Sequence, residues 1–170
     1  PLLFSELLER YSMKAGEMDV RVELDFPPGL PLIKADREGV SLVIGNLILN
    51  GLVHAYPPGF PVKPEDRVLL IRVDVPDKNL VIEVEDRGCG IPQKEKKKIF
   101  GAFIRGETSR RSQIPGSGLG LHIARRTAEL SGGRLELVSP LSSTAASSGG
   151  VSGSLFRMII PVETVEVKDE

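Results

Sequence analysis

The spacing of apolar residues predicts alternating helices and strands along the 170-residue chain. Leu3, Leu7 and Tyr11 recur at helical spacing, which predicts a short amphipathic helix over residues 2–14. Apolar and charged residues alternate strictly over residues 20–26, and this period of two is typical of a half-buried strand. A Pro-Pro-Gly sequence directly afterwards ends that strand.

A second helix and a hairpin are predicted in the middle of the chain. Asp36 suits the N-cap of a helix that runs to about residue 55, where another Pro-Pro-Gly sequence stops it. Two apolar-rich runs, 68–75 and 80–85, are separated by the turn-forming residues Pro-Asp-Lys-Asn. We therefore expect an antiparallel pair of strands here.

The last third of the chain predicts one helix and two strands. Apolar spacing predicts a helix over residues 119–130, with Leu119, Ile123, Thr127 and Leu130 facing a core. Two closing strands, 134–138 and 154–160, flank a connector over 140–153 that is rich in Ser, Ala and Gly and is expected to be disordered. Because helices and strands are mixed and a hairpin requires antiparallel pairing, the expected class is α+β, a mixed sheet with helices on one face.

Composition narrows the classes of function. Lys and Arg number 22 and Asp and Glu 23, so the net charge of -1 argues against a broad positive field and against nucleic acid as a partner. The single cysteine cannot form an internal disulfide, which indicates a reducing, cytoplasmic setting. No apolar run reaches the roughly 18–20 residues that cross a bilayer. The chain begins without Met, so we expect a piece of a longer protein.

Two asparagines stand out on the predicted helix 36–55. Asn46 and Asn50 lie four residues apart and therefore on one helix face. Buried amides need partners, because an unsatisfied amide costs a few kcal/mol (about 1–3 in proteins). A structural hydrogen bond to a neighbouring element is one interpretation. The other is a pair of neutral oxygen ligands for Mg2+ and phosphate, since Mg2+ prefers oxygen.

An acidic residue ends the second strand of the hairpin. The period of two places Asp86 on the same face as Ile82 and Val84, where an unpaired charge is expensive. Gly88 and Gly90 follow and allow a sharp turn and a close approach. Either an Asx-type turn or a buried acceptor for a ligand donor, such as the exocyclic amine of adenine, explains this pattern.

Three alternating glycines precede the last predicted helix. Gly116, Gly118 and Gly120 can expose backbone N–H groups at a helix N-terminus, which attracts anions. The run is not a Walker A loop, because no Gly-Lys-Ser/Thr sequence follows, and no strand precedes it as in a Rossmann unit. A flexible loop end is the alternative interpretation.

Taken in order, these motifs resemble the histidine kinase catalytic domain, in the superfamily of gyrase, Hsp90, MutL and histidine kinases. The resemblance covers residues 17–162 and implies the Bergerat ATP-binding fold, a two-layer α/β sandwich with a mixed, mainly antiparallel sheet. It implies a residual linker helix over 1–16 and an acidic tail over 163–170. The motifs are Asn46/Asn50, Asp86-x-Gly88-x-Gly90-Ile91, Phe100-x-x-Phe103-x-Arg105 and the run from Gly116 to Leu121.

The resemblance implies a role for each matching residue. Asn50 would hold Mg2+, Asp86 would read the adenine amine, and Gly88 and Gly90 would give the ring room. Residues 104–115, with Arg105, Arg110 and Arg111, would form a mobile ATP lid. The residues assigned to nucleotide binding are Asn46, Asn50, His54, Asp86, Gly88, Gly90, Ile91, Phe103, Arg105, Gly116, Ser117, Gly118, Leu119, Gly120, Leu121 and Ser154.

Position 46 separates the branches of the superfamily. Gyrase-like ATPases and anti-sigma serine kinases carry a glutamate there as general base, and Asn46 cannot accept a proton. An imidazole acceptor fits, because its neutral nitrogen already carries a lone pair. His54 and His122 lack the setting of an acceptor on a dimeric helical hairpin, and His122 is expected to be a packing or surface residue. We therefore expect the phosphoacceptor histidine to lie outside this chain.

The resemblance implies ATP and Mg2+ as ligands, and a dimerisation and phosphoacceptor domain and a response regulator as partners. The isolated piece would be a monomer. Three alternatives stay open: an anti-sigma-type serine kinase, favoured by the run from Asn50 to Tyr56; a nucleotide-sensing module without transfer, since Val53 replaces a common basic residue; and a hydrolytic clamp. Gly51 stands where Ala is usual, which weakens the helix slightly. Residues 56–66 and 140–153 have the length of insertions.

Overall fold

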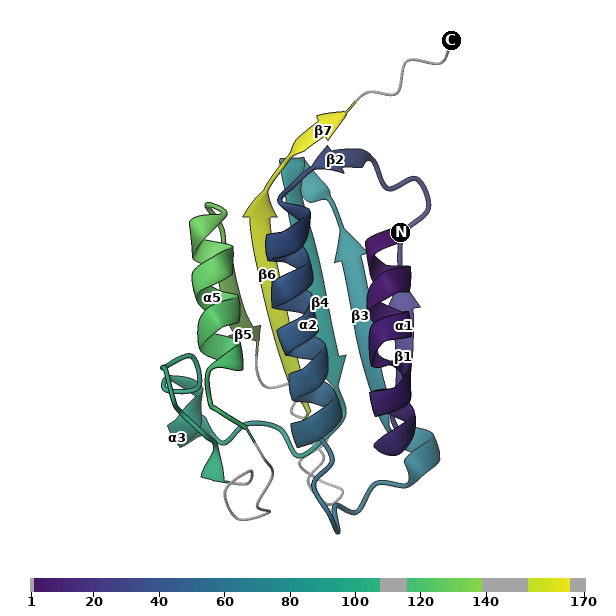
Figure 1. Cartoon of the computed structure of the whole chain (residues 1–170), viewed down its shortest axis with the longest axis vertical. Helices are drawn as coiled ribbons and strands as arrows, with labels where there is room; N and C mark the ends of the chain where they lie inside the picture. Colours follow the sequence, from purple (N-terminus) through teal and green to yellow (C-terminus); the bar gives the residue numbers. More distant parts are fainter. Residues whose placement is uncertain (1, 108–115, 139–152, 166–170) are drawn as a thin grey trace.

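A mixed five-stranded sheet forms one layer of the computed structural model, which describes residues 2–107, 116–138 and 153–165 (Figure 1). The strands lie in the order β1 (Arg21–Asp25), β3 (Val68–Asp74), β4 (Asn79–Asp86), β6 (Ser154–Pro161) and β5 (Arg134–Val138). Only β1 and β3 pair in parallel, and the other three pairings are antiparallel. The hairpin predicted from the sequence is therefore confirmed as β3 and β4.

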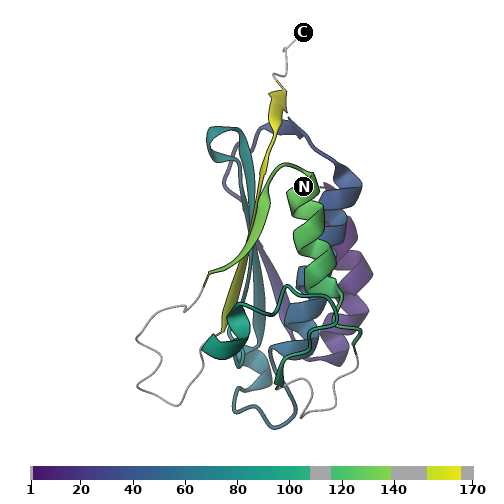
Figure 2. The same ribbon diagram turned by 90° about the vertical axis from the view of Figure 1, so that its left-hand side faces the viewer.

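Three helices form the second layer and cover one face of this sheet (Figure 2). They are α1 (Leu2–Glu17), α2 (Arg37–His54) and α5 (Gly120–Leu130), with α2 in the middle. Shorter elements connect them: the 3-10 turns η1 (Pro64–Asp66) and η2 (Pro76–Lys78), and the single-turn helix α3 (Gln93–Lys96). The expected two-layer α+β class is confirmed. None of the helices described combines the length and the apolar composition that a bilayer crossing requires.

A small second sheet was not predicted from the sequence. Strands β2 (Leu32–Lys34) and β7 (Glu163–Val165) pair antiparallel at the end of the molecule where the chain leaves β6 (Figure 1). Each strand has three residues and is largely exposed, so neither shows an apolar period long enough to recognise. The beginning of the predicted acidic tail is thus a strand.

Helix α1 contributes to the same core as the rest of the domain. Phe4 and Leu7 are buried, and the Phe4 ring meets the Phe26 ring edge-on with centroids 5.1 Å apart. The helix runs on to Glu17, three residues further than its apolar spacing predicts. Its origin as the end of a linker stays a prediction.

Helix α2 is buried on several sides, and its glycines let neighbours come close. The Asp36 side chain caps its N-terminus by accepting a hydrogen bond of 3.1 Å from the Glu38 amide, as predicted. A Cβ on Gly51 would stand 2.4 Å from Leu69 Cδ1 on β3. Glycine at this position is therefore explained by contact with the sheet, at a small expense in helix propensity.

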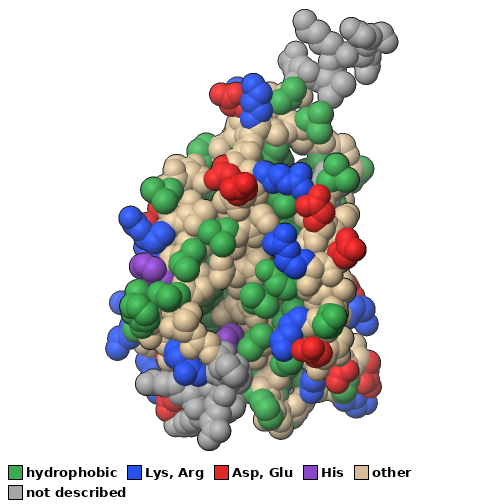
Figure 3. Space-filling view, viewed as in Figure 1, with side chains coloured by type: hydrophobic (Ala, Val, Ile, Leu, Met, Phe, Trp, Pro, Cys, Tyr) green, Lys and Arg blue, Asp and Glu red, His purple; other side chains and the backbone are tan. Residues whose placement is uncertain are grey.

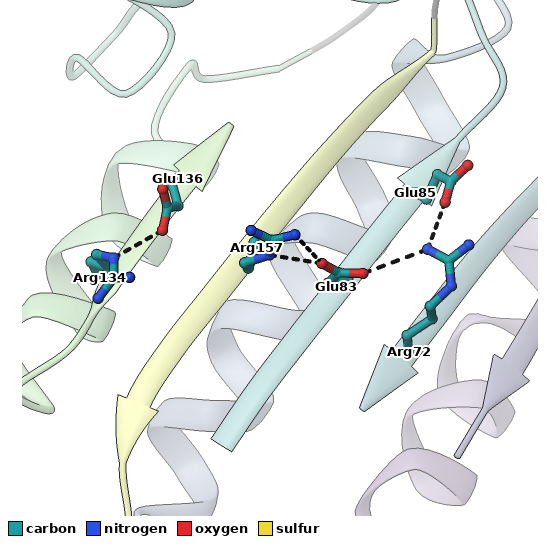
Figure 4. A network of polar contacts seen from close by, with 6 residues as sticks. All are labelled: Arg72, Glu83, Glu85, Arg134, Glu136 and Arg157. Carbon is teal, nitrogen blue, oxygen red and sulfur yellow. Dashed lines mark hydrogen bonds and ion pairs between the residues drawn. The ribbon is translucent and has the colours of Figure 1, made fainter. Parts of the chain in front are cut away.

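The two faces of β4 differ as its alternation predicts. Leu80, Ile82, Val84 and Asp86 are buried beneath the helices, whereas the intervening residues point to the other face. That outer face carries an ion-pair network (Figure 4), drawn with Arg72, Glu83, Glu85, Arg134, Glu136 and Arg157. Arg72 Nη1 lies 2.6 Å from Glu85, and Arg157 Nη2 lies 2.6 Å from Glu83, so the charges of neighbouring strands are paired.

The buried face predicted for α5 is wrong at Ile123 and Leu130. Ala124 and Ala128 are buried, while Ile123 is 39% exposed and Leu130 is 83% exposed. Helix α5 packs closely on α2, and a Cβ on Gly120 would already stand 2.8 Å from Asn46 Oδ1. Because α2 and α5 lie so close together, only small side chains fit between them, and the large apolar residues of α5 lie outside the contact. Residues 139–152, most of the connector predicted to be disordered, lie outside the described residues.

Candidate functional site

A cavity of about 340 Å3 opens beside the C-terminal half of α2, within the range typical of small-molecule sites. Its walls come from α2, the end of β4, the start of α5 and the loops before them. Most residues that the sequence predicted for a ligand site line it: Asn46, Asn50, His54, Asp86, Gly90, Ile91, Arg105, Gly116, Ser117, Gly118, Gly120, Leu121 and Ser154. Tertiary structure thus brings together motifs that are far apart in the sequence.

Asp86 is a buried carboxylate at the wall of this cavity. It is 4% exposed, and the Gly88 amide donates a hydrogen bond of 2.9 Å to its Oδ1. Burial raises the pKa of Asp86 to about 6, and hydrogen bonds from Gly88 and Ser154 limit the rise. The hydrogen bonds from Gly88 and Ser154 do not use all the acceptor positions of an ionised carboxylate. Asp86 can therefore also accept a hydrogen bond from an N–H group of a ligand.

Gly88 and Gly90 serve different purposes. Gly90 lines the cavity with φ at +68°. Gly88 does not line the cavity, and a Cβ there would stand 2.1 Å from the carbonyl oxygen of Ala55. The expectation that Gly88 gives a ligand ring room is corrected: it gives room to the end of α2.

Asn46 and Asn50 project from α2 toward the same cavity. The Asn46 Nδ2 donates a hydrogen bond of 2.8 Å to the Leu42 carbonyl, and its Oδ1 lies beside Gly120. Asn50 is half-buried and lines the cavity. Among the residues described, no group of three or more His, Cys, Asp or Glu could hold a metal. Asn50 supplies an amide oxygen, which is a hard donor. One such protein oxygen fits Mg2+ when phosphate oxygens of a ligand supply further donors.

The N-terminus of α5 lies beside Asn46, whereas the turn after Asp86 contacts Ala55 at the C-terminal end of α2. Burial lowers the pKa of His54 below its ordinary value, and the positive charge of Arg105 lowers it further. Helix α5 begins at Gly120, and its partial positive charge favours an anion here. Gly118 has φ at +71°, and a Cβ there would stand 2.8 Å from the Ile104 carbonyl oxygen.

Two further predicted residues do not reach the cavity. Phe103 is 73% exposed and has φ at +61°, and Leu119 sits at the N-cap of α5 with its amide 3.3 Å from Ser117 Oγ. Phe100 packs on Phe156 with ring centroids 6.2 Å apart, so its role is in the core. Arg110 and Arg111 lie outside the described residues.

Other residues of the wall were not among the nucleotide-binding residues predicted from the sequence. They are Leu49, Val53, Ala55, Cys89, Pro92, Glu95, Ile99, Ile104 and Gly106. Leu49 and Val53 lie three residues after Asn46 and Asn50, so helical spacing alone places them on that face.

His122 is half-buried with Nδ1 3.0 Å from the Phe100 carbonyl, which agrees with the packing role predicted for it. On the helical face, positive, negative and apolar side chains are interspersed (Figure 3).

The chain is similar to known proteins over most of its length. Residues 35–164 match the family described as histidine kinase-, DNA gyrase B- and HSP90-like ATPases. Sensor histidine kinase MtrB of Mycolicibacterium paratuberculosis is 30% identical over 148 residues, which is 87% of this chain and 23% of that protein. Sensor histidine kinase WalK of Bacillus subtilis is 30% identical over 131 residues, 76% of this chain and 20% of that protein.

Solved structures show the same fold. Full-length ShkA in complex with AMPPNP superposes with a TM-score of 0.75 at 22% identity, covering 97% of this chain and 30% of that one. The mycobacterial sensor histidine kinase MprB gives a TM-score of 0.72 at 22% identity, covering 96% of this chain and 94% of that one. The chain spans 23% of MtrB and 20% of WalK, so it covers only part of the length of these relatives.

Proposed function

Because the chain belongs to the family of histidine kinase-, DNA gyrase B- and HSP90-like ATPases, we propose that its cavity binds Mg-ATP for transfer of the γ-phosphoryl group to a histidine. The chain would be the catalytic domain of a two-component sensor histidine kinase. The observation that carries this proposal is the position of Asp86, a buried acceptor at the wall of a cavity that is also lined by Arg105 and by the N-terminus of α5. A nucleotide carries complementary groups, with a hydrogen-bond donor on its base and negative charge on its phosphates.

Asp86 would recognise the base. Its carboxylate accepts hydrogen bonds from Gly88 and Ser154 and would accept another from the exocyclic amine of adenine. A guanine ring presents a carbonyl oxygen at the corresponding position, and two acceptors repel one another. Adenine is therefore favoured over guanine.

The phosphate end would be held by neutral and positive groups. Backbone N–H groups at Gly118 and Gly120, the start of α5 and the Arg105 guanidinium would meet the phosphate oxygens. Mg2+, when bound, supplies neutralisation of phosphate charge, and Asn50 is the side chain that would hold it. Asn46, tied to the Leu42 carbonyl, would keep α2 and the glycine run in register.

The absence of a general base at position 46 favours a histidine as the phosphoryl acceptor. Asn46 accepts no proton, so it cannot act as the general base that an attacking water or serine hydroxyl requires. An imidazole nitrogen needs none, and positioning with charge neutralisation then suffices. His54 lies in the cavity wall and His122 is bonded to the Phe100 carbonyl, so the acceptor would belong to a dimerisation and phosphoacceptor domain outside these residues. A response regulator would receive the phosphoryl group next, in the cytoplasm where ATP is available.

Labelled ATP and a separately supplied acceptor hairpin test the transfer. We expect Mg2+-dependent labelling of the hairpin histidine that is lost on treatment with acid and absent for Asn50→Ala. Acid-stable labelling would instead indicate the anti-sigma-type serine kinase, which Asn46 argues against. Tight nucleotide binding without labelling of any histidine hairpin would indicate a sensing module, the alternative that the apolar Val53 in the cavity wall favours.

A further inference from the structure

We infer that Tyr56 is a positioning residue for nucleotide binding: its hydroxyl fixes the turn that orients Asp86. This inference rests on the proposed function, because it concerns the base-recognition end of the same cavity. Tyr56 does not line the cavity. It follows the end of α2 and is 4% exposed, so its action on a ligand is exerted through the backbone of the turn.

The Tyr56 hydroxyl joins two strands. It donates a hydrogen bond of 2.9 Å to the Val68 carbonyl and lies 3.1 Å from the Val68 amide, both at the start of β3. It also accepts a hydrogen bond of 3.2 Å from the amide of Arg87, the residue directly after Asp86. One buried oxygen atom thus connects the end of α2, the beginning of β3 and the end of β4.

Other backbone groups of the turn also form hydrogen bonds. The Cys89 amide donates a hydrogen bond of 2.8 Å to the Ala55 carbonyl, and the Gly153 amide donates one of 3.0 Å to the Gly88 carbonyl. Gly88 itself donates to the Asp86 carboxylate. The Arg87 amide donates its hydrogen bond to the Tyr56 hydroxyl. This side-chain contact therefore fixes the backbone directly after Asp86, and with it the direction of the Asp86 carboxylate.

The arrangement links both ends of the ligand site to one helix. Asn50 lies within α2, and Ala55 and Tyr56 follow directly at its C-terminal end. A shift of this end would move the Asp86 turn relative to Asn50, and the distance between base and metal sites would change. Specificity for the base therefore depends on a residue that never contacts it.

Substitution by phenylalanine removes only the hydroxyl. Tyr56→Phe leaves the amides of Arg87 and Val68 without this acceptor. We expect affinity for a nonhydrolysable ATP analogue to fall about three- to tenfold, the loss expected for one or two hydrogen bonds. Affinity for tripolyphosphate with Mg2+ should change less than twofold, because that probe has no base. Tyr11→Phe is the matched control, since Tyr11 is the other tyrosine of the chain and packs on Gly45 away from the cavity.

A double-mutant cycle separates positioning from general stability. In the Asp86→Asn background, where the base acceptor is already altered, Tyr56→Phe should reduce affinity less than twofold. An equal loss in both backgrounds, or an equal loss for tripolyphosphate, would overturn the inference and assign Tyr56 to stability alone. All titrations are made at a temperature where each variant is fully folded.

Amide exchange gives a second readout that needs no ligand. In Tyr56→Phe, the exchange of the Arg87 and Gly88 amides should accelerate at least tenfold more than that of buried β4 amides such as Ile82. Uniform acceleration would contradict a local role. Absence of nucleotide binding by the wild-type chain would remove the proposed function, whereas normal wild-type binding with unchanged exchange in the variant would remove only the role of Tyr56.

Discussion

The Gly88 amide donates a hydrogen bond of 2.9 Å to Asp86 Oδ1, across a turn in which Gly88 has no space for a side chain. The Ala55 carbonyl at the end of α2 occupies that space. A buried acid is therefore held by a turn that is itself held by a helix end. Replacement of Asp86 should therefore have opposite effects on the stability of the domain and on its affinity for nucleotide.

Asp86→Asn should stabilise the ligand-free domain at neutral pH while it weakens nucleotide binding. The native pKa of about 6 lies above the ordinary value of 3.8, so the folded state binds this proton more tightly than the unfolded chain. Stability therefore falls as the pH rises from about 4 to 6, and the whole deficit is present above pH 6. We expect the variant to gain about 1–3 kcal/mol at pH 7.5 and nothing near pH 4, measured by urea unfolding.

Asp77→Asn is the matched control for this effect, because Asp77 is exposed and the change in net charge is identical. The control should leave the free energy of unfolding within about 0.5 kcal/mol of the wild type at both pH values. A loss of stability in Asp86→Asn at pH 7.5 would contradict the account.

The affinity for adenine nucleotides should fall as the pH drops below about 6. Acceptance of the adenine amine requires an ionised Asp86, whose pKa is raised to about 6 by burial. Calorimetric titration of ADP from pH 5 to 8 should show up to a tenfold loss of affinity per pH unit below that value. Tripolyphosphate, titrated in parallel, reports phosphate ionisation and the protonation of His54. An identical pH profile for both ligands would exclude Asp86 as the source.

Asn50→Ala should remove the Mg2+-dependent part of the affinity. The side chain contributes a hard oxygen to the cavity, and the described residues offer no alternative cluster of acidic or histidine ligands. We expect the affinity for ADP with Mg2+ to fall about tenfold or more, the scale of one lost contact between a neutral polar group and a charged one, while the affinity in EDTA changes less than twofold. Asn79→Ala, at the far end of β4, is the control, and equal losses with and without Mg2+ would speak against a metal role.

Gly118→Ala and Gly116→Ala should differ sharply although they lie two residues apart. Gly118 has a positive φ, and a Cβ there would meet the Ile104 carbonyl oxygen at 2.8 Å, whereas a Cβ on Gly116 meets nothing within 4 Å. We expect Gly118→Ala to reduce stability by about 2 kcal/mol or more and to weaken ATP binding. Gly116→Ala should change stability by no more than about 0.5 kcal/mol, and similar thermal midpoints for the two variants would refute the packing seen here.

Gly51→Ala should destabilise the domain despite a better helix former. The gain in helix propensity is about 1 kcal/mol, whereas forcing a methyl group against buried Leu69 costs about 1–3 kcal/mol. In the Leu69→Val background the contact is relieved, so there the same substitution should become neutral or stabilising. Equal effects in both backgrounds, measured by chemical unfolding, would show that this contact does not set the preference for glycine.

Much of the candidate site was predictable because its motifs depend on local periods. The alternation along β4 placed Asp86 on the buried face, and the spacing of Asn46 and Asn50 placed both amides on one side of α2. Helix α5 was predicted in extent but not in orientation, because the identity of the buried face depends on how closely α2 approaches. That approach admits Ala124 and Ala128 and leaves the larger Ile123 outside.

By itself, the sequence determined the α+β class, the central helix and hairpin and the faces on which Asn46, Asn50 and Asp86 lie, because each follows from a period or spacing within about 20 residues. Only the tertiary structure decided which contacts surround those residues. It assigned Gly88 to the Ala55 carbonyl, left Phe103 exposed, paired β2 with β7 and joined Tyr56 to the Asp86 turn. These relationships connect residues far apart in the chain, and their energies depend on distances that no local pattern encodes.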